Sequence, residues 1–257
     1  MATPRESSHE LENLGELIHD FGVGGWTADR ADEAFAEIAG RSLRLESFYE
    51  IDAGFVTEVT ASSQPLPLGS VLEAIGRSVH QHLFDGILRI AGEYRKASDP
   101  GGGFVSFGGP KGQTTRPLFQ GAPVSSLPTA IEDTFSQLAD FREGAMSTVA
   151  ETRVAAQADA TSAAVLFYKD FSGVHPFYDA NGRTARYVVS VYLLLHGLHV
   201  RWAALDERET KFMKRINECL KRRSHADPSV LTTYETYLVN FWRPFVEAIP
   251  DDPPLTA

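Results

Sequence analysis

The stretch HPFYDANGRTAR, residues 175–186, brings a histidine, an acid, an Asn-Gly pair and two arginines into twelve positions. Segments with helical spacing of apolar residues flank it: SAAVLFYKDFSGV at 162–174 and RTARYVVSVYLLLHG at 183–197. Gly173 is expected to end the first helix, and Gly197 the second. The twelve residues are therefore predicted to form a tight loop that leads into the start of the second helix.

The second half of this loop has the residue types of an anion site. Asn181 and Gly182 tolerate left-handed backbone and can turn the chain into the following helix, whose free N–H groups and dipole favour a di- or triphosphate. Arg183 and Arg186 lie three positions apart, so they share one helix face and can hold separate phosphate oxygens. Two cations at a helix N-terminus interact unfavourably with the helix dipole. An anion bound next to them would compensate, so their position also predicts an anion site.

The first half supplies groups for chemistry on that anion. Asp179 would repel bare phosphates but is useful if Mg²⁺ lies between the carboxylate and the phosphate oxygens. His175 can be neutral near pH 7 and can take a proton from an incoming hydroxyl. Phe177 is expected to anchor the loop in the core. Together these residues predict a site for nucleotide transfer.

The rest of the chain reads as mainly α. Apolar residues recur at helical spacing through most of its 257 positions, and 43% of the side chains are hydrophobic, enough for a sizeable core. One segment differs: residues 99–123 are rich in Gly and Pro around a short strand signal at 104–107, which predicts an irregular β-hairpin. Cys219 is the only cysteine, so no intramolecular disulfide can form.

Charge and hydropathy exclude several classes of partner. With 34 acidic and 24 basic residues the formal charge is −10, which argues against a nucleic-acid or anionic-membrane footprint. The apolar run at 187–200 is too short to span a bilayer and is predicted to be a buried helix. The N-terminus lacks a secretory pattern, so a cytoplasmic location is expected, with a secreted effector left open. Four histidines near apolar helix faces are expected to be structural or surface residues, namely His80, His82, His196 and His199.

The loop resembles the signature of the Fic (Fido) family, H-x-F-x-[DE]-[GA]-N-G-R-x-x-R, and every specified position matches. The resemblance extends over about residues 71–200. It implies a mainly α fold, a Fic-type helical bundle with a short β-hairpin flap. The expected division is an N-terminal helical portion at 1–66, a Fic core at 67–205 and C-terminal helices packed on that core at 206–257.

The resemblance also implies an activity, protein adenylylation. His175 would be the general base that activates a Ser, Thr or Tyr hydroxyl of a target protein, and Asp179 would hold Mg²⁺. AMP would pass from ATP to the hydroxyl while pyrophosphate leaves. The residues implied to bind the nucleotide phosphates are Asn181, Gly182 and Arg183 around the α- and β-phosphates, and Arg186 at the γ-phosphate.

Two further segments are similar to parts of that family. Residues 83–95, LFDGILRIAGEYR, resemble the helix end that precedes the family's flap, and the Gly-rich hairpin follows them. The hairpin is then expected to dock the target backbone by strand addition, through Phe104, Val105, Ser106 and Phe107. The alternative is a mobile surface loop.

The N-terminus carries a candidate brake. Residues 8–13, SHELEN, match the family's inhibitory pattern [ST]-x-x-x-E-[GN] through Ser8, Glu12 and Asn13. The resemblance implies that Glu12 pairs with Arg186 and blocks productive ATP binding, and that it could also position a water for removal of AMP. The alternative is an ordinary helix cap, because Ser7 and Glu10 form a capping box.

Other activities stay open at this point. The signature fixes the diphosphate chemistry better than the base, so transfer of UMP, GMP, phosphate or phosphocholine is an alternative. Gly182 argues against the kinase-like relatives, which carry lysine there. A non-catalytic module that binds nucleotide or a partner is a second alternative, and self-association is left open.

Overall fold

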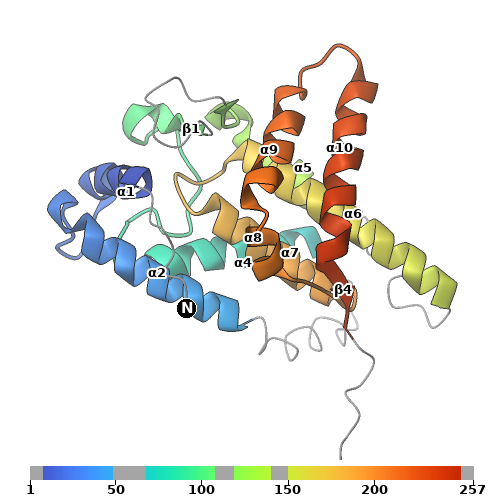
Figure 1. The fold of residues 1–257 in the computed structure, drawn as a ribbon. Coiled ribbons are helices and arrows are strands. Elements are labelled where there is room, and N and C mark those ends of the chain that lie inside the picture. Colours follow the sequence, from blue (N-terminus) through green and yellow to red (C-terminus); the bar gives the residue numbers. More distant parts are fainter. Residues whose placement is uncertain (1–7, 49–67, 108–118, 140–149, 250–257) are drawn as a thin grey trace, which may run out of the picture.

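The computed structural model describes residues 8–48, 68–107, 119–139 and 150–249, and most of them are helical (Figure 1). The mainly α prediction is confirmed. The α-helices are α1 (Ser8–Phe21), α2 (Ala31–Phe48), α4 (Leu68–Phe84), α5 (Leu127–Ala139), α6 (Ala150–Val174), α7 (Asn181–Leu194), α8 (Trp202–Asp206), α9 (Glu209–Lys221) and α10 (Pro228–Trp242). Short 3₁₀ helices occur at Ala28–Arg30, Pro100–Gly103, Val124–Ser126 and Arg243–Phe245.

Two small antiparallel ladders accompany the helices. In the first, β1 (Ser106–Phe107) pairs with β2 (Phe119–Gln120), with Ser106 opposite Gln120. This is the predicted hairpin, although its first strand begins two residues later than expected, and its tip at 108–118 lies outside the described residues. In the second, β3 (Leu198–Val200) pairs with β4 (Val246–Ala248).

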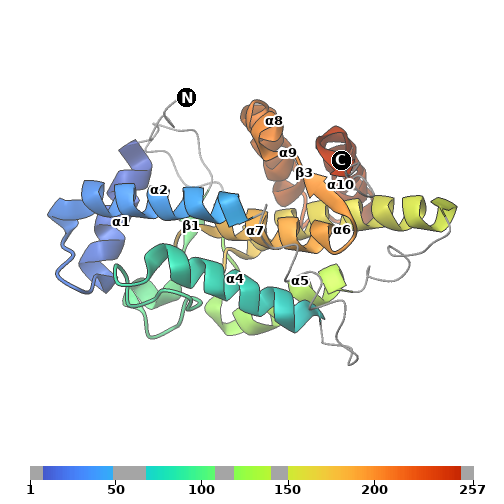
Figure 2. The same ribbon diagram turned by 90° about the horizontal axis from the view of Figure 1, so that it is seen from below.

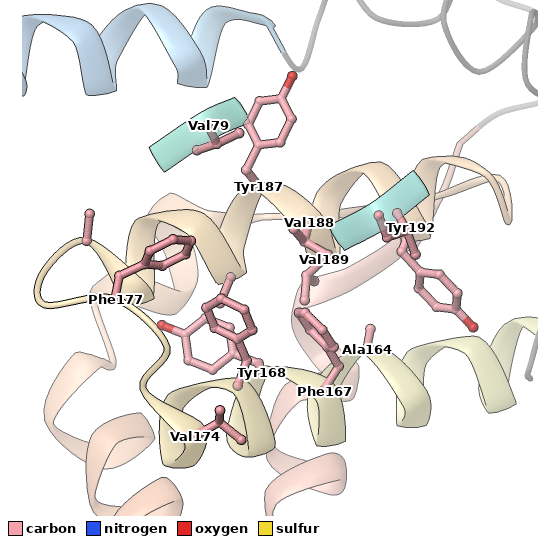
Figure 3. Close-up of a cluster of buried hydrophobic side chains, with 14 of the residues drawn as sticks. Val79, Ala164, Phe167, Tyr168, Val174, Phe177, Tyr187, Val188, Val189 and Tyr192 are labelled. Carbon is pink, nitrogen blue, oxygen red and sulfur yellow. The ribbon is translucent and has the colours of Figure 1, made fainter. Parts of the chain in front are cut away.

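The helices α6 and α7 form the centre of the molecule. Figure 2 shows α4 and α5 on one side of this pair and α8, α9 and α10 on the other, with α1 and α2 covering the outer end of α4. Fully buried Ala160, Ala164 and Ala185 allow the two central helices to approach closely. Figure 3 shows the side chains of Phe177 and Val188 in this core, so the loop between the two helices is anchored as predicted.

A second cluster of aromatic side chains joins the C-terminal helices to α6. Trp242 at the end of α10 is fully buried, and its ring centroid lies 5.7 Å from Tyr168, 5.3 Å from Trp202 and 5.4 Å from Phe212. These rings come from α6, α8, α9 and α10. Large aromatic groups bury much apolar area, so this cluster fixes α8 and α9 against the central pair.

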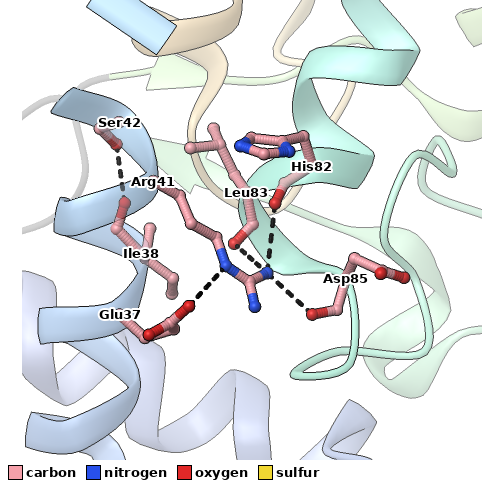
Figure 4. A network of polar contacts seen from close by, with 7 residues as sticks. All are labelled: Glu37, Ile38, Arg41, Ser42, His82, Leu83 and Asp85. Carbon is pink, nitrogen blue, oxygen red and sulfur yellow. Dashed lines mark hydrogen bonds and ion pairs between the residues drawn. The ribbon is translucent and has the colours of Figure 1, made fainter. Parts of the chain in front are cut away.

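The helix α2 is attached to the C-terminal end of α4 through Arg41 (Figure 4). One guanidinium nitrogen donates to the carbonyl oxygens of His82, Leu83 and Asp85 at 2.8 to 3.2 Å, and Nε donates to Glu37 at 3.0 Å. The last carbonyls of a helix have no partner within it, and a cation there complements the dipole. Arg41 therefore caps α4 and holds the N-terminal helices against it.

His80 on α4 is a buried structural residue, as expected. Its Nδ1 accepts a hydrogen bond from the Gly92 N–H at 2.9 Å, and its ring stacks on Phe177 at a centroid distance of 3.9 Å. Burial and the positive charge of Arg183 lower the pKa of His80 to about 3. The imidazole is thus neutral in the folded protein at neutral pH, and it supports the ring that anchors the loop.

The lowered pKa of His80 predicts a loss of stability in mild acid. Between the unfolded value of about 6.5 and the folded value of about 3, the unfolded chain binds a proton that the folded chain does not. The contribution of His80 to the free energy of unfolding is therefore fully present above pH 6.5. Below pH 6.5 the free energy of unfolding falls, and this group accounts for up to about 1.4 kcal/mol for each pH unit. Urea unfolding at pH 7, 6 and 5 measures the slope. His80→Gln should reduce the slope to the part that His175 contributes, since the pKa of His175 is lowered as well, and the exposed His199→Gln should leave it unchanged. Equal slopes in all three proteins would contradict the assignment.

Candidate functional site

The loop at 175–180 contains the two non-glycine residues with left-handed backbone in the described part of the chain, His175 at φ 51° and Ala180 at φ 56°. The expectation that Asn181 and Gly182 make this turn is wrong, because α7 already begins at Asn181. The Asn181 side chain instead closes the loop. It accepts from the Phe177 N–H at 3.0 Å and donates to the Phe177 carbonyl at 2.9 Å.

Gly173 does not end α6 as predicted but lies within its last turn. A β-carbon there would lie 2.8 Å from Leu220 and from the Arg223 guanidinium, so the position accommodates the end of α9. The helix ends one residue later, at Val174, and the left-handed His175 redirects the chain. The glycine thus serves close packing between helices, which a single sequence does not distinguish from a helix stop.

The His175 imidazole lies between the end of α6 and the β-hairpin. It stacks on Phe107 of β1 with centroids 4.2 Å apart and planes 6° apart, and Nδ1 lies 3.4 Å from the Ser172 carbonyl oxygen. Burial, aided by the charge of Arg95, lowers the pKa of His175 to about 4, although the Ser172 carbonyl and Asp179 favour the charged form. His175 is therefore neutral at pH 7. A carbonyl only accepts, so Nδ1 carries the hydrogen and Nε2 is free to accept a proton.

Asp179 and Arg183 lie together at the start of α7. An Arg183 terminal nitrogen lies 3.6 Å from the Asp179 carboxylate, and both side chains are about one third exposed. The same carboxylate accepts from the Ala180 N–H at 2.5 Å. The other guanidinium nitrogen donates to the Ser42 hydroxyl of α2 at 3.4 Å, so an N-terminal helix reaches the loop.

Arg186 is held by Asp206, a residue that the sequence analysis missed. The two guanidinium nitrogens donate to the two carboxylate oxygens at 2.9 and 2.5 Å, and the guanidinium also lies 5.0 Å from the Trp202 ring. Burial alone would lower the pKa of Arg186, but hydrogen bonds with Asp206 and Tyr168 raise it above its usual value. Asp206 lies at the end of α8, twenty positions along the chain, and no local pattern marks it.

A cavity of about 700 Å³ reaches His175 and the start of α7. Its lining includes His175, Asn181 and Gly182 and, from α9, Thr210, Met213 and Asn217 among others. The α9 residues were not expected in the site, because the amphipathic pattern of this segment is also that of a helix packed on the core. Met213 is 41% exposed, and an exposed apolar residue on such a helix is a signal only once the fold is known.

The sequence profile of the Fic/DOC family matches residues 72–193, which include the whole loop and both central helices. Residues 72–193 of the chain belong to the Fic/DOC family. No curated protein shows a significant match to the sequence.

Solved structures of Fic domains share the fold. One is the N-terminal Fic domain of a cell filamentation protein from Bartonella quintana, a VirB-translocated Bep effector solved with bound ADP. It is 14% identical, with 89% of this chain and 90% of that chain covered and a TM-score of 0.54. A second Bep Fic domain from the same organism is 15% identical, with 85% and 84% covered and a TM-score of 0.50. At these identities the likeness shows the fold alone.

The hairpin of this Fic domain stands over His175. Phe104, just before β1, is 60% exposed, whereas Phe107 is half buried and stacks on the histidine. Val105 accepts a backbone hydrogen bond from Gly121 at 3.1 Å. Of the four residues expected to dock a target, two therefore lie in β1 and two precede it; their role in docking stays a prediction.

The predicted brake lies at the first turns of α1. Ser8, Glu12 and Asn13 are helical, and their side chains lie outside the described residues. The other end of this helix contacts the Fic loop, because the ring of Phe21 lies 5.1 Å from that of Tyr178. The assignment of Glu12 as an inhibitory residue stays a prediction, as does the division of the chain at residues 66 and 205.

Metal and membrane features are limited in the described part of the chain. No cluster of three or more His, Cys, Asp or Glu side chains there could hold a metal ion by itself. Asp179 offers one partly exposed carboxylate beside Arg183, which fits an ion such as Mg²⁺ that takes its other ligands from phosphates and water. None of the described helices combines the length and the apolar character needed to cross a bilayer.

Proposed function

We propose that this chain transfers AMP from ATP to a Ser, Thr or Tyr hydroxyl of a target protein. The observation that carries the proposal is the cavity of about 700 Å³ that joins a neutral His175 to the exposed Gly182 at the start of α7. A general base and an anion-binding helix end share one space. Membership of the Fic/DOC family supports nucleotide transfer of this general kind.

The start of α7 supports binding of the phosphates. The first N–H groups of a helix have no partner within it, and Gly182 leaves them accessible because it has no side chain. Arg183 lies beside them on the first turn and offers charge to a phosphate oxygen. We propose that Asn181 contributes mainly by shaping the loop, since its amide is already bonded at both ends to Phe177.

The wall formed by α9 supports binding of the nucleobase. Met213 offers an apolar surface on which a flat ring can stack, while Thr210 and Asn217 offer hydrogen-bonding groups to its edge. These side chains line the same cavity as Gly182, so a nucleotide whose base binds them could extend its phosphates toward the start of α7.

The chemical step follows from the free Nε2 of His175. This nitrogen takes the proton of the target hydroxyl as its oxygen bonds to the α-phosphorus, while the bond to the bridging oxygen breaks and pyrophosphate leaves with the electron pair. Asp179 would hold Mg²⁺, which neutralises phosphate charge when bound. The chain's own contribution is positioning and charge, and the β1–β2 hairpin over His175 would align the target backbone.

The position of the radiolabel in ATP tests the proposal. Purified protein with Mg²⁺ is incubated with a cell lysate and with ATP labelled at the α- or the γ-phosphate. Labelling of protein from α-labelled ATP alone, lost in His175→Ala, supports adenylylation. Labelling from γ-labelled ATP alone would mean phosphate transfer, and labelling from α-labelled UTP or GTP but not ATP would mean another nucleotide. Nucleotide binding without labelling from any source would identify a non-catalytic module.

We further propose that Glu12 restrains the reaction. Glu12→Gly is expected to raise the labelling rate roughly 5- to 150-fold, the usual range for coupling between two sites, because it removes the carboxylate that the family resemblance pairs with Arg186. Initial rates of labelling measure this, with Glu16→Gly on the same helix as the matched control. Asp206→Asn frees Arg186 from its observed partner. An increase in Asp206→Asn without one in Glu12→Gly would assign the restraint to Asp206 instead.

A further inference from the structure

Arg95 is a buried arginine at the end of the segment GEYR, residues 92–95, and it takes no part in the proposed chemistry described so far. Its side chain is 3% exposed. Among the described residues no carboxylate forms an ion pair with it, and burial lowers the pKa of its guanidinium. A cation buried in this way is costly unless its donors are bonded. The guanidinium meets this requirement entirely through backbone carbonyls.

Four carbonyl groups accept from the Arg95 side chain. Nε donates to His175 at 2.8 Å, one terminal nitrogen donates to Gly103, and the other donates to Ala122 at 3.0 Å and Val174 at 3.3 Å. The backbone N–H of Arg95 adds a bond to the Pro176 carbonyl at 3.1 Å. Only the planar fork of arginine presents donors in this many directions.

The accepting carbonyl groups belong to three segments that are separated in the sequence. Gly103 precedes β1 and Ala122 follows β2, so they are the two ends of the hairpin. Val174 and His175 are the junction of α6 with the loop, where the backbone turns left-handed. One side chain thus fixes the hairpin and the histidine relative to each other.

Gly121 shows how tightly this junction is packed. A β-carbon at Gly121 would lie 2.9 Å from an Arg95 terminal nitrogen, 2.7 Å from Val105 and 3.2 Å from the Val174 carbonyl. No larger residue fits without displacing the guanidinium or the hairpin. The position therefore offers a way to disturb the junction without removing a single donor.

We propose that Arg95 is a positioning residue of the transfer reaction: it holds the backbone of His175 and both ends of the β1–β2 hairpin on one guanidinium. The expected effect on the reaction rate rests on the proposed function. The expected effect on the position of His175 does not rest on it. Loss of the junction leaves nucleotide binding at α7 and α9 in place and misaligns the base with the docked hydroxyl. A misplacement of about 1 Å can cost about 10²-fold in rate.

The experiment compares Arg95→Lys, Gly121→Ala and Arg77→Lys with the wild type. Arg77 is the matched control, because among the described residues it donates to one carbonyl, that of Gly92 at 2.9 Å, and not to those of the loop or the hairpin. Each variant is checked for folding by circular dichroism. AMP transfer gives kcat and KM for ATP, and NMR of protein with ¹³C-labelled histidine reports the ring-current shift that Phe107 imposes on the His175 imidazole. The His175 signal is assigned with His175→Gln.

In Arg95→Lys and Gly121→Ala we expect kcat to fall roughly 10- to 100-fold with KM for ATP unchanged, and the His175 signal to move toward that of a free histidine. Arg77→Lys should match the wild type in both. Folded variants with a wild-type His175 signal and kcat would overturn the inference. If neither the wild type nor any variant transfers AMP but the His175 signal moves as expected, Arg95 still positions His175 and the hairpin, and the proposed function fails. If Arg95→Lys does not fold, Gly121→Ala decides alone.

Discussion

Replacing His175 with alanine is expected to lower the rate of AMP transfer by about 10²- to 10⁴-fold, the usual contribution of a general base. The free Nε2 would have no substitute, because the other groups that line the cavity beside it, such as Ser172 and Asn181, are poor bases at neutral pH. Transfer is measured as the initial rate from α-labelled ATP. Binding of a non-hydrolysable ATP analogue by calorimetry should stay close to that of the wild type, since the proposed phosphate site lies at the start of α7.

The decline of kcat at low pH is an independent check on the role of His175. Because burial lowers its pKa to about 4, the base form persists as the pH falls from 7 to 5, and kcat should decline only as the pH passes through about 4. His199→Ala, at an exposed position on β3, serves as the control and should keep wild-type kcat. If the His175→Ala protein retains AMP transfer, this residue has no part in the mechanism. If kcat of the wild type declines around pH 6.5, the pKa of the catalytic base is not lowered by burial.

The largest effect on stability is expected at Trp242. Trp242→Ala should lower the free energy of unfolding by about 3–5 kcal/mol, because a fully buried indole is replaced by a cavity between α6, α8, α9 and α10. Tyr168 belongs to the same cluster and lines the cavity proposed to bind the nucleotide, so the variant should also weaken nucleotide binding. Urea unfolding at neutral pH and calorimetry with the ATP analogue measure the two effects.

Trp242→Phe is the matched variant. The indole Nε1 has no hydrogen-bond partner among the described residues, so phenylalanine removes an unsatisfied buried donor along with part of the ring. The loss of stability should therefore be less than half that of Trp242→Ala. Equal losses in the two variants would mean that the cost comes from the indole N–H and not from the volume of the ring.

Some parts of the fold and of the site could be predicted from the sequence because their causes are local. Helical spacing on both sides of residues 175–186 indicated two helices joined by a loop, and α6 and α7 confirm it. The Gly- and Pro-rich segment indicated the hairpin. The motif itself predicted the family, which the Fic/DOC match confirms. In each case the signal lies within a short window of residues.

Other parts depend on packing between distant segments and left no local signal. Asp206 meets Arg186 only because α8 folds back over the start of α7. The wall of the cavity formed by α9 follows from the Trp242 cluster, which orients that helix. The left-handed residue is Ala180 and not Asn181, because the bonds of Asn181 to Phe177 outweigh its backbone preference. A single sequence contains none of these pairings.

The left-handed backbone of the loop has a consequence for a partly unfolded chain. His175 and Ala180 each occupy a conformation that costs an L-residue about 1–2 kcal/mol, so a free peptide of this sequence does not adopt the loop's shape. The shape is imposed from outside, by the burial of Phe177 and by the guanidinium of Arg95. The reactive arrangement therefore forms only where α6 and α7 have packed. A partly unfolded chain carries the motif without the geometry on which the proposed transfer depends.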